Sequence, residues 1–166
     1  MAGKRITKAK LGDVFEVKLE DDYKAYFQFI ALDIAQLNSE VIRVFKKRYC
    51  QDENPLLEEI VKDEVAFYAH VIIKFGIKLN VWEKVGNVER EESNDLPFFR
   101  DCKDYGNPQF HNKKSKNWHV WQVGKEFDFI GELTDKERIY DNGMVINPLG
   151  ILELLKGNKY PVNYPR

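Results

Sequence analysis

The sequence predicts an α+β domain built on a mainly antiparallel curved sheet or an SH3-like open barrel. Three strand-like runs follow one another within the first third of the chain, and the turn-prone breaks between them are short. Short connections favour antiparallel neighbours, and closely spaced, twisted strands are typical of small barrels and half-barrels. Further strand-like runs and two helical patterns complete the domain.

The first three strands are expected between residues 11 and 49. In the first run, Phe15, Val17 and Leu19 alternate with polar residues, which indicates a strand with one buried face. The second run, KAYFQFIALD, is apolar on both faces apart from Gln28, which suits a central strand. The third run is EVIRVFKK.

The middle of the chain combines one helix with two more strands. The dipeptide Asn54–Pro55 has the pattern of an N-cap followed by a first helical residue, so a short helix is expected near 55–62. Residues 65–74 return to a strand pattern, which Gly76 bends or ends. A further strand is expected over 77–85.

From residue 89 to residue 106 the sequence loses its regular period. Its first part holds four acidic residues against one arginine, and residues 100–125 hold six basic residues against two acidic ones. We expect a long, irregular excursion whose apolar middle is pinned to the core. Such loops are often binding sites.

The last third regains order. The runs 118–123 and 127–133 predict a hairpin that turns at Gly124. A helix is expected near 148–156, because an Asn-Pro pair precedes it and Gly157 follows it. Its apolar face should pack across one end of the sheet, through Ile151, Leu152 and Leu155.

Composition limits the domain organisation and the partners. The 166 residues fit a flexible basic arm over 1–10 and a single domain over 11–166. With 26 basic and 27 acidic residues, no global field favours nucleic acid or a membrane, and no run approaches the ~20 apolar residues of a membrane span. Cys50 and Cys102 are too few for a disulfide scaffold, so a reduced, cytoplasmic compartment is expected. Whether the two cysteines pair stays open.

No motif for catalysis, a cofactor or a metal stands out. The histidines and the second cysteine show no spacing that would place two donors on one ion: His70, His111, His119 and Cys102. His70 fits a satisfied sheet histidine. Nucleophile elbows, phosphate loops and dinucleotide fingerprints are absent from the sequence. We therefore predict no enzyme, unless His111 or His119 meets a carboxylate inside a pocket.

An alternative function is nucleic-acid binding through the segment from Lys113 to Trp121. It mixes lysines with Trp118 and Trp121, which are the ingredients of a groove that attracts phosphates and stacks bases. The competing interpretation is that the lysines decorate a loop and that one tryptophan belongs to the core. Exposed aromatic rings beside the lysines would favour nucleic acid.

Five segments occur in order between about Leu11 and Tyr160: KLGDVFEVKL, LPFFRDCKDYGNPQ, WHVWQV, FIGELT and VINPLGILELLKGNKY. In this order and spacing they resemble the immunity protein 26 family. The resemblance implies a part in a bacterial polymorphic toxin system, in which the immunity protein protects the producing cell by binding a cognate toxin domain. It carries over no inhibitory residues, and it leaves the toxin and the oligomeric state open.

A protein that blocks a toxin needs a rigid patch with a few anchors and complementary charge rather than catalytic groups. We place this patch on the 89–105 excursion, where acids would face a basic toxin cleft and aromatic or Arg side chains would serve as anchors. The proposed partner-binding residues are Glu89, Glu91, Glu92, Asp95, Phe98, Phe99, Arg100 and Tyr105. The competing interpretation makes Phe98 and Phe99 ordinary core residues and the acids solvated charge.

Overall fold

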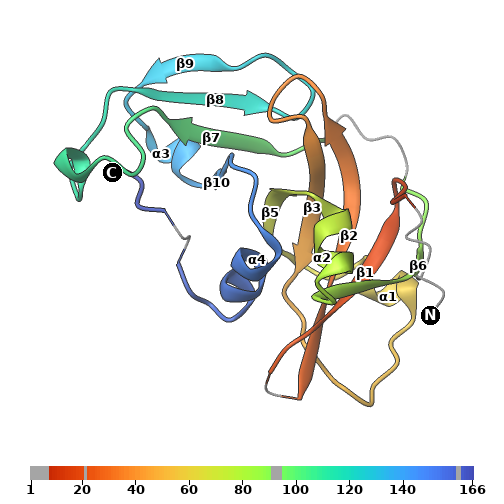
Figure 1. Ribbon diagram of the computed structural model, residues 1–166. Coiled ribbons are helices and arrows are strands. Elements are labelled where there is room, and N and C mark those ends of the chain that lie inside the picture. The colour runs from red at the N-terminus through yellow and green to blue at the C-terminus, as the bar shows by residue number, and fades with distance from the viewer. Residues whose placement is uncertain (1–7, 21, 91–94, 160–161) are drawn as a thin grey trace.

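The computed structural model describes residues 8–20, 22–90, 95–159 and 162–166, and their strands form two sheets (Figure 1). The first sheet has the order β5-β3-β2-β1-β6, with β4 paired to β2, and the second has the order β10-β7-β8-β9. The strands of the first sheet are β1 (Asp13–Lys18), β2 (Tyr23–Asp33), β3 (Ser39–Phe45), β4 (Tyr49–Cys50), β5 (Val65–Val71) and β6 (Trp82–Asn87). Those of the second are β7 (Phe98–Cys102), β8 (Trp118–Gln122), β9 (Asp128–Gly131) and β10 (Asp141–Asn142).

The helices are short: α1 (Leu57–Ile60), α2 (Ile73–Lys78), α3 (Asp135–Arg138), α4 (Pro148–Leu155) and a 3₁₀ turn over Pro108–Phe110. No helix in the described part of the chain has the length and apolar character that spanning a membrane requires.

The prediction of a mainly antiparallel α+β fold is confirmed. The described strands close no barrel, so the SH3-like barrel is not confirmed. Residues 1–7 of the expected basic arm lie outside the described residues.

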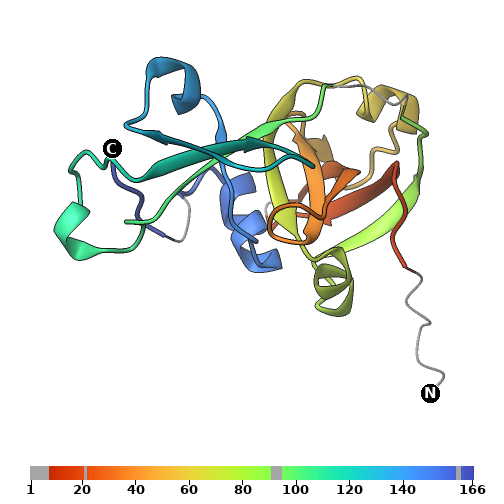
Figure 2. The same cartoon turned by 90° about the horizontal axis from the view of Figure 1, so that it is seen from above.

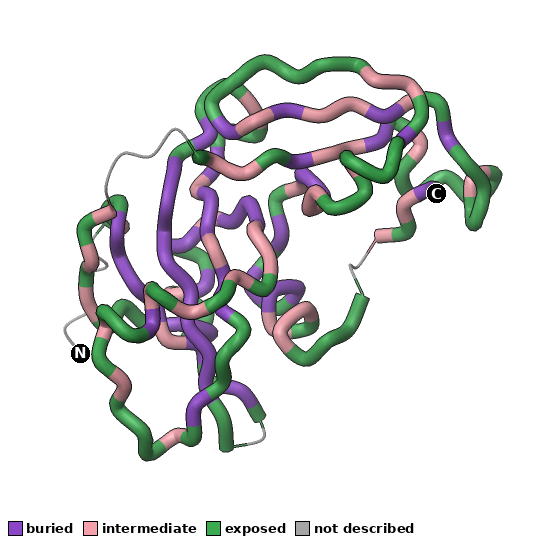
Figure 3. The backbone as a smooth tube through the Cα atoms, turned by 180° about the vertical axis from the view of Figure 1, so that it is seen from behind, coloured by how far each residue is buried: buried purple, intermediate pink, exposed green. Residues whose placement is uncertain are grey.

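The three predicted N-terminal strands are confirmed as β1, β2 and β3, which pair antiparallel. β2 is the central strand, and it is buried along most of its length (Figure 3). On one face Phe15 stacks on Phe27 with ring centroids 5.0 Å apart, and Trp82 meets Phe27 edge-on at 5.1 Å. The other face buries Tyr26 and Phe45 against α1. Because both faces are covered, this sheet holds most of the core.

Two predictions in the middle of the chain are wrong. The strand expected over 65–74 ends at Val71, and residues 73–78, which were expected to be extended, form α2. Gly76 does not bend a strand. It lies inside α2 directly against Trp82, and a Cβ built there would come within 1.9 Å of the indole ring. The glycine therefore permits a close helix-to-strand contact.

Two boundaries also differ from expectation. α1 covers 57–60 with Leu56 as its N-cap, so Asn54–Pro55 does not start it. The excursion over 89–106 is not irregular throughout, because Phe98–Cys102 forms β7 and pairs with β8. The run LPFFRDC does not alternate clearly between apolar and polar residues, so its pattern did not predict a strand. Its strand conformation depends on pairing with β8.

The C-terminal predictions are confirmed. β8 and β9 form a hairpin around Gly124, which has φ +81°. The Asn147 side chain caps α4 by accepting a hydrogen bond from Gly150 N at 2.8 Å, and Gly157 follows the helix with φ +84°. α4 packs Ile151 and its apolar neighbours against the core of the first sheet. Figure 2 shows the second sheet extending away from the first, with α4 beside the junction.

Candidate functional site

A buried carboxylate joins the two sheets. Asp33, the last residue of β2, accepts hydrogen bonds at Oδ2 from His70 Nε2 and from Trp121 Nε1, both at 2.9 Å. Its Oδ1 accepts from Gly124 N at 3.1 Å and from Gln36 N at 3.2 Å. A fully buried charge needs such donors to offset its lost hydration. Asp33 therefore fixes the position of the β8–β9 hairpin on the first sheet.

His70 is a sheet histidine, as predicted, and its Nε2 is satisfied by Asp33. Its ring lies 4.2 Å from that of Phe99, and among the described residues its buried Nδ1 has no hydrogen-bond partner. Burial lowers the pKa of His70, and the Asp33 carboxylate opposes this shift. Because Nδ1 lacks an acceptor, a second ring proton would be poorly accommodated, so the neutral imidazole suits this position.

Sequence analysis did not single out Asp33. The available signal was an acidic residue at the end of an eleven-residue strand whose other residues are mostly apolar. An acid in such a run is either exposed at the strand end or paired inside the fold, and the sequence does not distinguish the two. Its partners lie 37, 88 and 91 residues away in the chain.

The predicted acidic residues are only partly described. Glu89 follows β6 and Asp95 precedes β7, and both side chains are exposed. Glu91 and Glu92 lie outside the described residues. Asp95 leads into a segment that runs beside the hairpin, since Gln122 Nε2 donates to Leu96 O at 3.0 Å and Val123 N donates to Pro97 O at 3.1 Å. Asp95 is therefore placed at the Gly124 end of the second sheet.

The predicted anchors divide between surface and core. Phe98 is 41% exposed and stacks on Tyr140 with centroids 5.2 Å apart. Tyr105 is half exposed and stacks on Tyr164 at 5.8 Å. Phe99 has no exposed surface and packs in the junction core, so it is a core residue and not a surface anchor.

The anchors are not gathered at one point. Arg100 is half-buried and lies over the Trp118 ring at 5.5 Å. Phe98 pairs with Gln122 at the start of β7, whereas Tyr105 follows the far end of this strand. A five-residue strand spans roughly 13 Å between its end residues. Phe98 therefore shares one end of the second sheet with Asp95, and Tyr105 lies at the other end.

The segment considered for nucleic acid does not offer its indoles to bases. Trp118 and Trp121 are both buried. Trp118 stacks on Tyr164, and Trp121 donates to Asp33. Base stacking requires an accessible ring face. The lysines of this segment are exposed, but its two indole rings are not accessible for base stacking, which the nucleic-acid hypothesis requires.

The histidines form no catalytic arrangement in the described part of the chain. His119 Nε2 lies 3.8 Å from Asp101 Oδ2, which exceeds hydrogen-bonding distance. Burial raises the pKa of Asp101 and lowers that of His119, and the Tyr164 hydroxyl donates to Asp101 at 3.1 Å. His111 is exposed on a loop. Within the described ranges, no three His, Cys, Asp or Glu side chains group in a way that could hold a metal ion.

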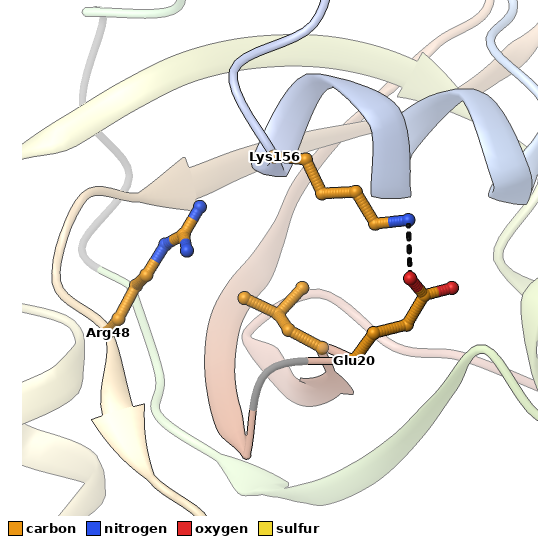
Figure 4. Close-up of a pocket in the computed structure, with 4 residues that line it drawn as sticks. Glu20, Arg48 and Lys156 are labelled. Carbon is orange, nitrogen blue, oxygen red and sulfur yellow. Dashed lines mark ion pairs between the residues drawn. The ribbon is translucent and has the colours of Figure 1, made fainter.

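A small surface pocket lies between the β1–β2 turn and the end of α4 (Figure 4). It has a volume of about 130 Å³ and is lined by Leu19, Glu20, Arg48 and Lys156. Lys156 pairs with Glu20 at 3.4 Å, and Arg48 donates to the carbonyl of Leu155. Since both cations already have partners, the pocket offers no free positive charge to an anion.

Two sheets joined at a buried carboxylate, with exposed aromatic rings on the second sheet, define a scaffold suited to binding another macromolecule. The family model of immunity protein 26 matches residues 10–111. The chain therefore belongs to the immunity protein 26 family. The match spans the whole first sheet and β7, and the resembling segments after residue 111 lie beyond it. Neither the curated proteins nor the solved structures contain a significant match.

Proposed function

We propose that this chain binds a cognate toxin domain and neutralises it, thereby protecting the cell that produces the toxin. The observation that carries this proposal is membership of the immunity protein 26 family, over a range that includes every strand of the first sheet. The protein would act by occluding the toxin and would perform no turnover itself. We place this action in the cytoplasm, in keeping with the low cysteine content.

The proposed contact surface begins at the end of the second sheet that holds Asp95 and Phe98. Phe98 is exposed and stacks on the half-buried Tyr140, and rigid aromatic side chains supply contact area at low entropic cost. Exposed acids nearby would speed encounter with a basic toxin cleft and reject other partners. Further candidates are Glu89, Glu91, Glu92, Arg100 and Tyr105.

Co-expression with a candidate toxin domain, sought among the genes beside this one, tests the function. We expect the wild-type chain to restore growth of cells that express the toxin, and to purify with it as a stable complex. A toxin that still kills in the presence of soluble immunity protein, and that shows no complex with it in titration calorimetry, would refute the proposal for that pair.

Charge reversal tests the acidic part of the surface. The triple variant Glu91→Lys, Glu92→Lys, Asp95→Lys should lower the association rate about 10- to 100-fold at low salt and weaken its salt dependence. The matched control is Glu58→Lys with Glu59→Lys, which reverses exposed acids on α1. Association of the triple variant at the wild-type rate in low salt would remove these acids from the interface.

A further inference from the structure

The turn between β2 and β3 is uncharged and apolar, although it is exposed. Residues 34–39 carry no charged side chain. Ile34 is 72% exposed, and Leu32 and Leu37 are 47% and 42% exposed. Single exposed apolar residues are ordinary, but contiguous ones on a monomer often mark an interaction site.

Leu37 occupies an unfavourable backbone conformation, with φ +57°. The left-handed region suits Gly or Asn and disfavours a residue with a bulky side chain. Burial does not compensate for this, since much of the side chain faces solvent. Neither local conformation nor packing accounts for a leucine at this position, and unfavourable conformations of this kind cluster at functional sites.

A second group of exposed apolar side chains lies on the β8–β9 hairpin. Phe127 and Phe129 are 48% and 61% exposed. Phe129 pairs with His119 across the strands, and the Phe127 ring lies 4.9 Å from that of His119. In an antiparallel pair, residues directly opposite share a face. Both phenylalanines therefore lie on the face that buries Trp121, but further out along it.

The Asp33 carboxylate joins the two segments that carry these groups. Its Oδ1 accepts from Gln36 N in the β2–β3 turn and from Gly124 N in the hairpin. Figure 1 shows the β2–β3 turn beside the end of the β8–β9 hairpin. Two segments that are about 90 residues apart in the chain are thus joined at Gly124, and Phe129, which pairs with His119, lies several residues further along the hairpin.

We propose that this junction surface, formed by Ile34, Leu37, Phe127 and Phe129, is the apolar centre of the interface with the toxin. The inference rests on the proposed function and adds contacts on the face of the second sheet that buries Trp121, opposite to the face of Phe98. Interface cores are apolar and aromatic, with charges at the rim, and binding energy concentrates in a few such anchors.

The charges around the junction surface favour a toxin, rather than a second copy of this chain, as the partner. Two exposed acids, Asp95 and Glu126, lie at the Gly124 end of the second sheet against one exposed lysine, Lys125, a balance of minus one. A symmetric contact would bring the same acidic rim against itself, and like charges across an interface are unfavourable. The occupant is therefore a different protein, with an apolar centre and a basic rim.

Two single variants, Ile34→Lys and Phe129→Lys, test the junction surface from its two segments. Titration of each against a toxin domain that the wild-type chain neutralises in co-expression should show affinity at least about 100-fold below that of the wild type. Leu56→Lys is the matched control, since Leu56 is 64% exposed and precedes α1 on the first sheet. We expect it to bind within about twofold of the wild type. Circular dichroism confirms that each variant is folded.

The outcomes separate this inference from the proposed function. A wild-type chain that does not bind the toxin refutes the proposed function, and the junction surface as its interface falls with it. If the wild type binds and both lysine variants bind equally well, the function stands and the junction surface is excluded. If light scattering shows a wild-type dimer that Phe129→Lys dissociates, the surface belongs to a second copy instead.

Discussion

The two sheets differ in how their faces are covered. The first sheet buries both faces of its central strand and gathers two core clusters around it. The second sheet buries Phe99 and Trp121 against the first sheet and Cys102 and Trp118 on its other face, but leaves Phe129 largely exposed. The difference teaches that the first sheet is the larger framework, while the second is docked onto it and keeps some apolar side chains exposed.

Removing the carboxylate that joins the sheets should have the largest effect. Asp33→Ala leaves the buried donors of His70 and Trp121, and the N–H of Gly124, without their acceptor. Each unsatisfied group costs about 1–3 kcal/mol, so we expect the free energy of unfolding to fall by roughly 3–5 kcal/mol. Urea denaturation measures this. Asp52→Ala, at an exposed acid, should change it by less than about 0.5 kcal/mol, and a similarly small change for Asp33→Ala would contradict a joining role.

Two glycines allow the sheets to be disturbed separately. A Cβ at Gly143 would come within 2.0 Å of Trp121, and one at Gly76 would come within 1.9 Å of Trp82. We expect each Ala variant to lose about 1–3 kcal/mol through overpacking. Hydrogen exchange should show that Gly143→Ala weakens protection in β7 and β8 while β2 stays protected. Equal loss of protection in both sheets would mean that they open as one unit.

Acidification should weaken the junction through His70. Burial lowers the pKa of His70 in the folded state below its ordinary value of 6.5, so the unfolded chain takes up this proton first. The stabilisation is present above pH 6.5 and is lost as the pH falls through the folded-state pKa. Between pH 7.5 and 5.5 the wild type should lose stability, at up to about 1.4 kcal/mol per pH unit for one proton.

The matched comparison is between two histidines. His119 also has a lowered pKa, but it is less buried than His70. Urea denaturation at each pH should therefore show that His70→Gln flattens the pH dependence more than His119→Gln does. A slope that survives in His70→Gln and disappears in His119→Gln would place the sensitive group on the outer part of the second sheet.

The smallest expected effect is a gain in stability. Leu37→Asn relieves the positive φ of an exposed residue and should raise the free energy of unfolding by about 0.5–1 kcal/mol. If the leucine is kept for binding, the same variant should bind the toxin domain more weakly. Increased stability with unchanged toxin affinity would remove Leu37 from the junction surface while leaving the strain argument intact.

Local patterns predicted the elements whose causes are local. The alternation in β1 and the Asn147 cap of α4 each lie within a few residues of the element that they define. α2 was missed because the apolar, β-branched residues over 71–77 favour a strand. The helix there depends on packing Gly76 against Trp82, a residue on the following strand.

The candidate surface was less predictable, because register and long-range contacts decide it. Phe98 and Phe99 are chemically identical neighbours, yet one is exposed and the other is core, since successive strand residues point to opposite faces. Sequence analysis placed the candidate surface at Asp95 and Phe98 and did not consider Ile34 or Phe129. Their segments are joined by hydrogen bonds to Asp33, and no spacing rule detects such bonds.

The two thiols differ in a way that makes binding experiments practical. Cys50 is exposed on β4 of the first sheet, whereas Cys102 is fully buried on β7, and burial raises its pKa. Maleimide chemistry needs an accessible thiolate. A fluorescent dye should therefore attach selectively at Cys50 in the unmodified sequence, and it would report toxin capture from β4, which pairs with the end of β2 that is far from the junction surface.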